Sequence, residues 1–301
     1  MWRVCLLLLC SATLLQADDA PKAASEPAAA KKKKPKQYTL RQEIRSGDRF
    51  IGSNTIKFDL KTTYKLGNKE RKTYEQVERT ERFRDVVKQA SARGPMEIQR
   101  TYQKKYTKVR DDDRGRAQID RSPLQGHELT IKENLRSRRV RSKLPFTIPP
   151  LVRKSIGVEM DWRDILPREP IQVGDRWQAD AESIAARLAP YFDSGNRSKM
   201  IVTFEAIEKV EGVERAKFYV DWKFEGMRDR ELFAKVRLAG DLYFDLEMKR
   251  FTLIDLAGTI KLEGVRMGKA HHEIVIGTGE ASYKSSVQRA AVAAAAEAES
   301  K

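Results

Sequence analysis

The side chains best suited to bind a metal or move a proton are three histidines, His127, His271 and His272. Neighbouring residues of a strand point to opposite faces, so His271 and His272 cannot hold one ion together. Asp111–Asp113 offer the carboxylate oxygens that calcium prefers, but they lack the alternating ligands of a calcium-binding loop. The sequence therefore predicts neither a metal site nor a cofactor.

Nucleophiles and acid–base pairs are equally scarce. Cys5 and Cys10 are the only cysteines, and both lie in a predicted export signal that cleavage would remove. The chain contains no Gly-x-Ser-x-Gly, Ser-x-x-Lys or phosphate-loop motif, so no residue is assigned a catalytic role. A carboxylate pair that hydrolyses glycosides is defined by its distance in space, which leaves a carboxylate-based hydrolase open. The chain is more typical of a binding protein than of an enzyme.

Positive charge is the most pronounced chemical feature of the sequence. The net charge is +16, and residues 98–143 hold fourteen Lys and Arg against six Asp and Glu. A concentration of this kind attracts polyanions and anionic surfaces. The densest part supplies the candidate anion-binding residues, which are Arg136, Arg138, Arg139, Arg141 and Lys143.

The composition sets the two ends of the chain apart from the middle. Residues 1–17 combine Arg3 with a short apolar stretch, which predicts a signal peptide cleaved near Ala17. Residues 18–36, rich in Ala, Lys and Pro, predict a disordered tether, and residues 289–301 form an Ala-rich tail. We therefore expect the protein in the periplasm or outside the cell, with no transmembrane span and no nucleic-acid partner.

Residues 232–248 alternate between apolar or small side chains and mostly charged or aromatic ones. A period of two predicts a strand with one dry face and one wet face. At about 3.3 Å per residue the segment would extend roughly 55 Å, several times the length of the usual strand of about 5–6 residues. Because sheets twist, a sheet of such strands is expected to curl around its dry face.

Similar alternation occurs over most of the remaining chain. Residues 37–147 predict an N-terminal β region, in which residues 72–90 are highly charged and ambiguous, and residues 193–288 predict a C-terminal β-meander. Several glycines fall inside predicted strands, where glycine indicates a sharp bend or the close approach of another backbone. They are Gly240, Gly258, Gly277 and Gly279.

The spacing of the apolar residues changes from every second position in residues 148–192, which we expect to form a helical insertion. Apolar residues recur at every third or fourth position in residues 151–165 and again in residues 181–188, which predicts two short helices. Between them, the run from Pro170 to Trp177 predicts a short strand, a Gly-Asp turn and a tryptophan that anchors the core.

These patterns predict a mainly β protein: a long, strongly curved antiparallel sheet, either a half-barrel or an open barrel, with two short central helices. The dry concavity of such a sheet could hold a ligand under a lid formed by residues 181–189, although apolar stripes usually form a plain core. The candidate lining residues are Trp222, Phe224, Leu238, Leu242, Phe244, Leu256 and Ile260 from the sheet, and Ile184 and Leu188 from the lid.

Four short motifs follow one another along the body of the chain. They are Leu124-Gln125-Gly126, Ile165-Leu166-Pro167, the run from Pro170 to Trp177, and Gly240-Asp241-Leu242-Tyr243-Phe244-Asp245. Their order resembles families of secreted bacterial β-proteins of unknown function. The long curled sheet with a helical interruption also resembles the periplasmic lipoprotein carriers of the LolA/LolB type. That resemblance implies an open half-barrel that closes helices over an apolar concavity holding acyl chains.

Three functions remain open, and we favour the first. It is a secreted, non-catalytic envelope protein that binds an apolar or amphipathic molecule, such as a lipid, in the concavity of the sheet. The second is an interaction protein that grips an anionic envelope polymer or surface through the basic patch, with binding that weakens steeply as salt is added. The third is the hydrolase, which requires two carboxylates about 5–10 Å apart in a cleft.

Overall fold

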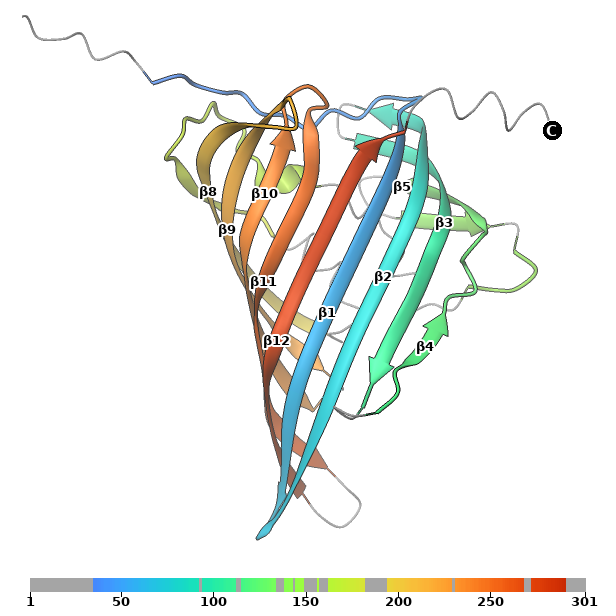
Figure 1. Ribbon diagram of the computed structural model, residues 1–301, viewed down its shortest axis with the longest axis vertical. Coiled ribbons are helices and arrows are strands. Elements are labelled where there is room, and N and C mark those ends of the chain that lie inside the picture. Colours follow the sequence, from blue (N-terminus) through green and yellow to red (C-terminus); the bar gives the residue numbers. More distant parts are fainter. Residues whose placement is uncertain are drawn as a thin grey trace, which may run out of the picture. The chain divides into compact units, whose positions relative to one another are not determined.

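The computed structural model describes residues 35–91, 94–111, 115–133, 138–142, 144–148, 156, 162–181, 194–228, 231–267 and 272–290. The residues from Lys36 onward belong to one compact unit. Its strands form a single antiparallel sheet of twelve strands (Figure 1). The predicted signal peptide and nearly all of the predicted tether lie outside the described residues.

Long strands make up the middle of the sheet, and short strands lie toward its two edges. The N-terminal strands are β1 (Arg49–Leu66), β2 (Lys69–Ser91), β3 (Gly94–Arg110), β4 (Gln118–Arg121), β5 (Glu128–Glu133) and β6 (Arg138–Ser142). The C-terminal strands are β7 (Arg176–Ala179), β8 (Ser194–Val210), β9 (Val213–Arg228), β10 (Leu232–Asp245), β11 (Arg250–Met267) and β12 (His272–Arg289).

The pairing of β1 with β12 joins the two β regions of the chain into one sheet. The strands follow the order β6-β5-β3-β2-β1-β12-β11-β10-β9-β8-β7, and β4 pairs with β3 beside this path. Residues 37–147 and residues 193–288, which the sequence presents as separate regions, thus meet along most of the length of these two strands. The contact cannot be read from local patterns, because it links segments more than two hundred residues apart.

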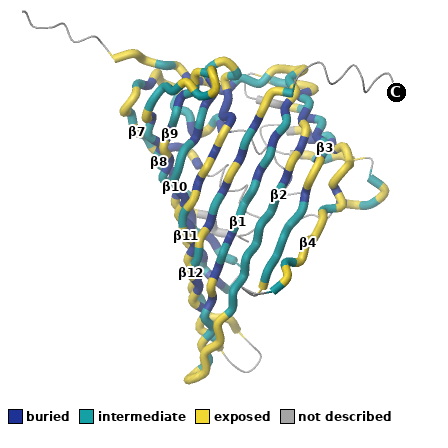
Figure 2. Tube along the Cα trace, viewed as in Figure 1, coloured by how far each residue is buried: buried dark blue, intermediate teal, exposed yellow. Residues whose placement is uncertain are grey.

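Most of the long strands alternate between buried and more exposed residues, β2 only in its second half, so the sheet has one dry face and one wet face (Figure 2). The strand predicted over residues 232–248 is β10, which ends three residues early at Asp245. The carboxylate oxygen Oδ1 of Asp245 accepts hydrogen bonds from the backbone N–H groups of Glu247 and Met248, at 2.9 and 2.8 Å. This local bonding turns the chain back into β11.

The glycines inside the strands mark places where neighbouring backbones come close. A Cβ atom added to Gly258 would lie 1.8 Å from the carbonyl oxygen of Arg237, and one on Gly279 would lie 1.8 Å from that of Asp59. Gly240 has the same crowding and a φ of 151°, a backbone conformation that L side chains rarely adopt. The close approach expected from the sequence is confirmed at these three positions.

The strong curvature predicted from the strand length is not found over the sheet as a whole. The sheet is open and is neither closed nor strongly curled, so the half-barrel and open-barrel predictions are wrong at this level of detail. Strand length imposes twist between neighbouring strands, but closure also requires the two edges to pair in register. Among the described strands the edges are β6 and β7, which have only five and four residues.

The two predicted helices are also not seen in the described part of the chain. Its helical segment is a single 3-10 turn, η1 (Arg163–Ile165), which ends just before Pro167, where the first helix was expected to stop. The other described residues of 151–165 are not helical, and the second expected helix lies outside the described residues except for Ala181. No helix in the described ranges is long and apolar enough to cross a membrane.

Candidate functional site

The larger hydrophobic cluster lies on the dry face, chiefly over β8 to β12, with β1 and β7 at its margins. It contains all seven sheet residues that were predicted to line a ligand site, and each of them is between 0 and 3% exposed. The structure therefore brings these seven residues together in one apolar surface that the chain itself covers. Ile184 and Leu188, the predicted lid residues, lie outside the described residues. We call the larger hydrophobic cluster on the dry face the first cluster.

Part of the cover of the first cluster comes from the segment around η1. The ring of Trp162 lies 6.4 Å from that of Trp222 and stacks on Tyr283 with the ring centres 5.9 Å apart. Trp177, which follows the Gly-Asp turn, donates an indole hydrogen bond of 2.7 Å to the carbonyl oxygen of Ile165. Trp177 thus packs against the core as the sequence predicted, and its polar tip is satisfied.

A row of polar side chains crosses the dry face beside the first cluster. Ser285 of β12, Asn54 of β1, Glu81 of β2 and Lys105 of β3 stand opposite one another in the strand register. All four are buried, and Ser285 Oγ donates a 2.6 Å hydrogen bond to Asn54 Oδ1. We call these four residues, together with Arg79 of β2, the polar belt. It separates the first cluster from a second one, built mainly on β2, β3 and β5.

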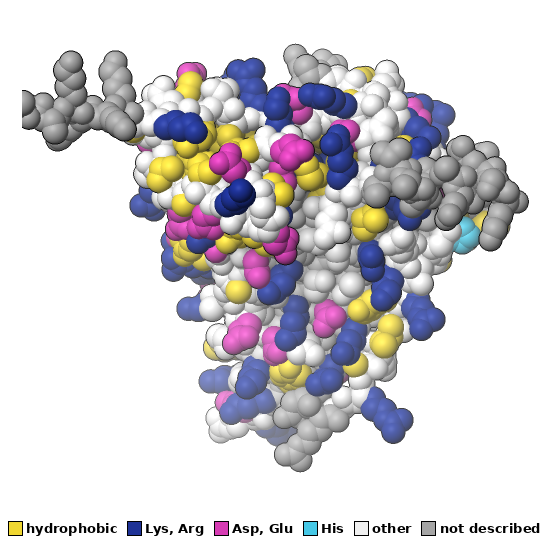
Figure 3. All heavy atoms as spheres, turned by 45° about the horizontal axis from the view of Figure 1, so that its top comes forward, with side chains coloured by type: hydrophobic (Ala, Val, Ile, Leu, Met, Phe, Trp, Pro, Cys, Tyr) yellow, Lys and Arg dark blue, Asp and Glu magenta, His cyan; other side chains and the backbone are white. Residues whose placement is uncertain are grey.

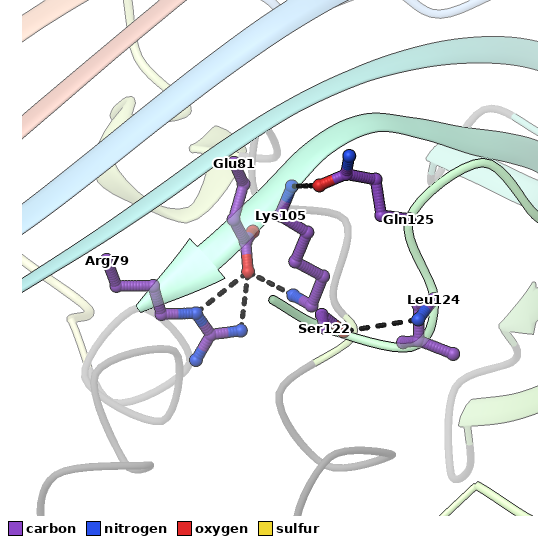
Figure 4. A network of polar contacts seen from close by, with 6 residues as sticks. All are labelled: Arg79, Glu81, Lys105, Ser122, Leu124 and Gln125. Atoms are coloured by element: carbon purple, nitrogen blue, oxygen red, sulfur yellow. Dashed lines mark hydrogen bonds and ion pairs between the residues drawn. The ribbon is translucent and has the colours of Figure 1, made fainter. Parts of the chain in front are cut away.

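Glu81 is the negative centre of the polar belt (Figure 4). Its Oε1 atom accepts a hydrogen bond from Arg79 Nε at 2.9 Å and another from the Lys105 ammonium group. Burial on its own would raise the pKa of the Glu81 carboxyl, but the charges of Lys105 and Arg79 outweigh burial and lower it. The carboxylate is therefore ionised at neutral pH and cannot serve there as a general acid.

A β-bulge explains why Lys105 belongs to the polar belt. Simple alternation along β3 would place Lys104 in phase with the buried Tyr102. The register between β2 and β3 shifts at Gln103, which has no partner residue opposite it. The extra residue reverses the phase, so that Lys105 points into the dry face and Lys104 is exposed.

A second buried ion pair stands inside the second cluster. Arg100 is fully buried, and its Nε and one terminal nitrogen donate to the two carboxylate oxygens of Asp85 at 2.7 and 2.6 Å. The guanidinium also lies 3.8 Å from the ring centre of Phe83. A bidentate pair stacked on an aromatic ring satisfies both charges, so this arrangement is structural in character.

One ion pair joins strands that are far apart in the sheet. Glu75 of β2 and Arg228 of β9 both face the dry side, and one terminal nitrogen of Arg228 lies 2.9 and 3.0 Å from the two carboxylate oxygens. Four strands separate β2 from β9. At about 4.8 Å per strand step, a flat sheet would hold these side chains out of reach. The dry face is therefore hollowed at this end of the sheet.

Of the five predicted anion-binding residues, the structure places two. Arg139 and Arg141 are exposed on the wet face of the edge strand β6, while Val140 between them packs against the second cluster. Arg136 and Lys143 lie outside the described residues, as does the side chain of Arg138.

Other cations continue this basic area across neighbouring strands. The register of β2 to β6 puts further Lys and Arg residues on the same wet face, and Lys132 among them pairs with Glu97 at 2.6 Å. Figure 3 shows one face of the molecule on which Lys and Arg side chains are widespread. We call the following set the basic face: Arg82, Arg84, Lys104, Lys108, Arg121, Lys132, Arg139 and Arg141.

The residues considered for metal binding are dispersed. His127 is exposed, with its ring 6.2 Å from that of Phe146, and His272 is exposed on β12. His271, Asp112 and Asp113 lie outside the described residues. In the described ranges no three or more His, Cys, Asp or Glu side chains gather as a metal site would require.

Two carboxylates share one cation on the wet face. Lys217 Nζ lies 3.1 Å from Glu205 Oε2 and 3.3 Å from Asp241 Oδ2. The hydrogen bond to Glu205 is the main cause that raises the pKa of Lys217; burial acts against it, and the hydrogen bond to Asp241 adds to it. The lysine stays protonated, so Lys217 itself is neither a base nor a nucleophile.

The polar belt was not found from the sequence. A signal existed, because Arg79, Glu81, Phe83, Asp85 and Val87 share one phase of a period of two. Charges at three of these five positions hide the pattern from a search for apolar alternation. Their partners on β3 are also displaced by a bulge, which local patterns do not reveal.

Among solved structures the chain has distant matches. No protein-family model and no curated protein sequence matches the chain. A solved structure described as "Lipid-protein interactions in lipovitellin" matches with a TM-score of 0.42 and 5% sequence identity. The match covers 83% of this chain and 26% of that one, so this chain spans about a quarter of its length.

Proposed function

We propose that this protein binds the apolar part of a lipid or another amphipathic molecule along the first cluster. The observation that carries the proposal is one continuous apolar surface on the dry face of β8 to β12. Tryptophan, phenylalanine and long aliphatic side chains dominate it, which is the composition of sites for apolar ligands. The hollowing that the Glu75–Arg228 pair requires adds depth to the face at one end.

The polar belt gives this surface a chemically distinct boundary. An amphipathic ligand whose tail lies on the first cluster would meet hydrogen-bonding groups at Ser285 and Asn54, where the belt crosses β12 and β1. The Nδ2 atom of Asn54 is buried and has no hydrogen-bond partner in the described part of the chain. An unsatisfied buried donor favours a polar acceptor at this boundary.

Entry of a ligand requires the cover of the first cluster to move. The seven lining residues are almost completely buried, and the described part of their cover includes Trp162, just before η1, and Ile165, the last residue of η1. A single 3-10 turn has few backbone hydrogen bonds to hold it in place. We therefore propose that this segment is displaced when the ligand binds.

Two measurements test the proposal. The purified protein is extracted with organic solvent and the extract analysed for lipid by mass spectrometry; bound lipid is the expected result. The protein is also titrated with a brominated fatty acid, which quenches nearby indoles. Trp162, Trp177 and Trp222 all pack in or against the first cluster, so strong quenching is expected. An empty extract together with unquenched tryptophan fluorescence would refute the proposal.

A matched pair of variants locates the ligand. Val236 in the first cluster and Val287 in the second are both 3% exposed on the dry face. Val236→Phe and Val287→Phe add the same volume, and overpacking costs each about 1–3 kcal/mol of stability. We expect Val236→Phe to reduce fatty-acid binding and Val287→Phe to leave it unchanged. Equal effects of the two variants would place the ligand elsewhere.

A second candidate function rests on the basic face. Its eight cations lie on five adjacent strands, from Arg82 on β2 to Arg141 on β6, and most are exposed. Such an array attracts an anionic envelope polymer or surface, with an affinity that falls as salt screens the charges. Retention on an anionic matrix should therefore weaken steeply with salt.

The basic face can be tested against cations at the opposite side of the sheet. Arg139→Ser with Arg141→Ser should shift elution from the matrix to lower salt. Lys199→Ser with Lys223→Ser removes two exposed cations that stand opposite each other on β8 and β9, and should have a smaller effect. Equal shifts for the two pairs would show that net charge alone, and not the basic face, governs retention.

Export is proposed on the sequence alone. The predicted signal peptide would deliver the protein to the periplasm or the medium, where lipids and anionic envelope polymers are both present. Fractionation of cells expressing the full chain tests this, and recovery of uncleaved protein from the cytoplasm would refute it.

A further inference from the structure

Four strands end together at the narrow lower end of the sheet in Figure 1. There β1 pairs with β2 on one side and with β12 on the other, and β12 pairs with β11. This end consists of residues 61–66, 69–72, 261–267 and 272–276, which we call the tip. The tip combines exposed apolar residues with basic ones.

The apolar residues of the tip are on the wet face, where the rest of these strands is mostly polar. Val265 stands opposite Ile274 in the register, and Met267 and Ile276 flank them. Their exposed fractions are 44% for Val265, 52% for Ile274, 69% for Met267 and 48% for Ile276. Single exposed apolar residues are common, but four adjacent ones mark an interaction surface.

Basic side chains lie beside this apolar patch and on the face behind it. The tip contains seven Lys and Arg against three Glu. Lys65 stands directly opposite Ile274 on the wet face, and Lys261 precedes the apolar positions on β11. Lys61 and Lys72 also lie on the wet face, while Arg71 and Arg266 lie on the opposite, dry face, 4.4 and 5.8 Å from the ring centre of Tyr64. The apolar centre and cationic surroundings complement a membrane with negatively charged headgroups.

We propose that the tip docks onto an anionic phospholipid membrane, with the four apolar side chains inserted among the headgroups and the cations against them. The proposal rests on the lipid-binding function, because a protein that carries lipid must meet a lipid surface. A second copy of the chain is a poorer partner for the tip. Two tips in contact through their apolar patches would bring the wet-face lysines of one copy against those of the other.

Sedimentation of the full-length protein with vesicles tests the docking. We expect it to sediment with vesicles of phosphatidylcholine mixed with phosphatidylglycerol, and much less with phosphatidylcholine alone. Met267→Asp with Ile274→Asp should weaken vesicle binding at least about tenfold, since burial of one aliphatic side chain contributes roughly that factor. Lys65→Glu with Lys261→Glu should reduce binding to the charged vesicles and make the remainder insensitive to salt.

Leu253→Asp is the matched control, because Leu253 is a half-exposed apolar residue on the wet face of β11 outside the tip. It should leave vesicle binding unchanged, and thermal unfolding of each variant verifies its fold. Equal loss with Leu253→Asp, or equal binding to neutral and charged vesicles, overturns the proposal. A dimer of the unmodified protein that the tip substitutions dissociate would also overturn the proposal.

The lipid content of the purified protein keeps the two proposals distinguishable. If the tip docks, the Met267→Asp and Ile274→Asp variant retains the lipid found in the unmodified protein while it loses vesicle binding. If the protein carries no lipid and binds no fatty acid, the proposed function fails. Vesicle binding that still depends on the tip would then show a membrane-binding surface without a carried ligand.

Discussion

Two strands of the same dry face, β9 and β2, are built from different chemistry. The dry positions of β9 are Ala216, Phe218, Val220, Trp222 and Phe224, whereas those of β2 include Arg79, Glu81, Phe83, Asp85 and Val87. Both sets pack against neighbouring strands of one sheet. The first set is buried chiefly by apolar contacts. In the second set, Glu81 and Asp85 meet cationic partners on β3, and Arg79 pairs with Glu81 on its own strand.

This difference shows that the two sides of the sheet are specified in different ways. Apolar packing tolerates exchanges that conserve volume, so the β9 side depends on total volume and on close backbone contacts. Buried charges require the correct partner in the correct register, so the β2 side depends on pairing. Each prediction below acts on one of these two dependences.

The largest loss of stability is expected from Gly258→Val, which lies on the β9 side of the sheet, where apolar packing dominates. A Cβ atom at this position would lie 1.8 Å from the carbonyl oxygen of Arg237, which is backbone and cannot move aside. We expect a loss of more than about 4 kcal/mol of unfolding free energy, measured by urea denaturation. Ala257→Val, on the exposed wet face of the same strand, should leave stability nearly unchanged. A Gly258→Val protein as stable as its parent would contradict the backbone contact.

Glu81→Gln should have the next largest effect on stability. It acts on the β2 side of the sheet, where buried charges are paired. The substitution leaves the buried Lys105 and the partly buried Arg79 without their shared carboxylate. Breaking a buried ion pair by removal of one partner costs about 3–5 kcal/mol, again measured by urea denaturation. Glu263→Gln, which breaks the exposed pair with Lys235, should leave the urea midpoint unchanged. Equal midpoints for the two variants would argue against a buried network.

Acid should lower the stability of the fold through protonation of Glu81 on the β2 side of the sheet. Its folded-state pKa is lowered from the ordinary value of 4.5, so the ionised group stabilises the fold above that value. This stabilisation is lost as pH falls below 4.5 toward the lower folded-state pKa. The urea midpoint should therefore fall more between pH 7 and pH 3.5 in the unmodified protein than in Glu81→Gln. Parallel declines in the two proteins would assign the acid sensitivity to other groups.

The smallest effect is expected when the polar belt loses all its charges at once. Arg79→Leu, Glu81→Leu and Lys105→Met in one protein replace the network by apolar side chains of similar reach. Such replacements are often neutral or stabilising, because the cost of desolvating the charges also disappears. We expect a urea midpoint close to that of the unmodified protein. A drop as large as that of Glu81→Gln would show that the charges themselves stabilise the fold.

The sequence predicted the apolar side better than the paired side. Alternation located β10 with an error of three residues at its end, and it selected seven residues that share one buried surface. Residues 72–90 were ambiguous because charges occupy the dry positions of β2. The bulge at Gln103 changed which lysine is buried, and nothing in the local pattern marks it. Sheet curvature was overestimated because strand length fixes twist but does not fix closure.

The sequence by itself determined that the protein is built from long strands with one dry face, because a period of two is a property of neighbouring residues. It also determined the excess of positive charge and the scarcity of catalytic side chains. Only the tertiary structure decided that β1 pairs with β12, that Ser285, Asn54, Glu81 and Lys105 align, and that four exposed apolar residues gather at the tip. These features depend on the register between distant segments, which no local pattern encodes.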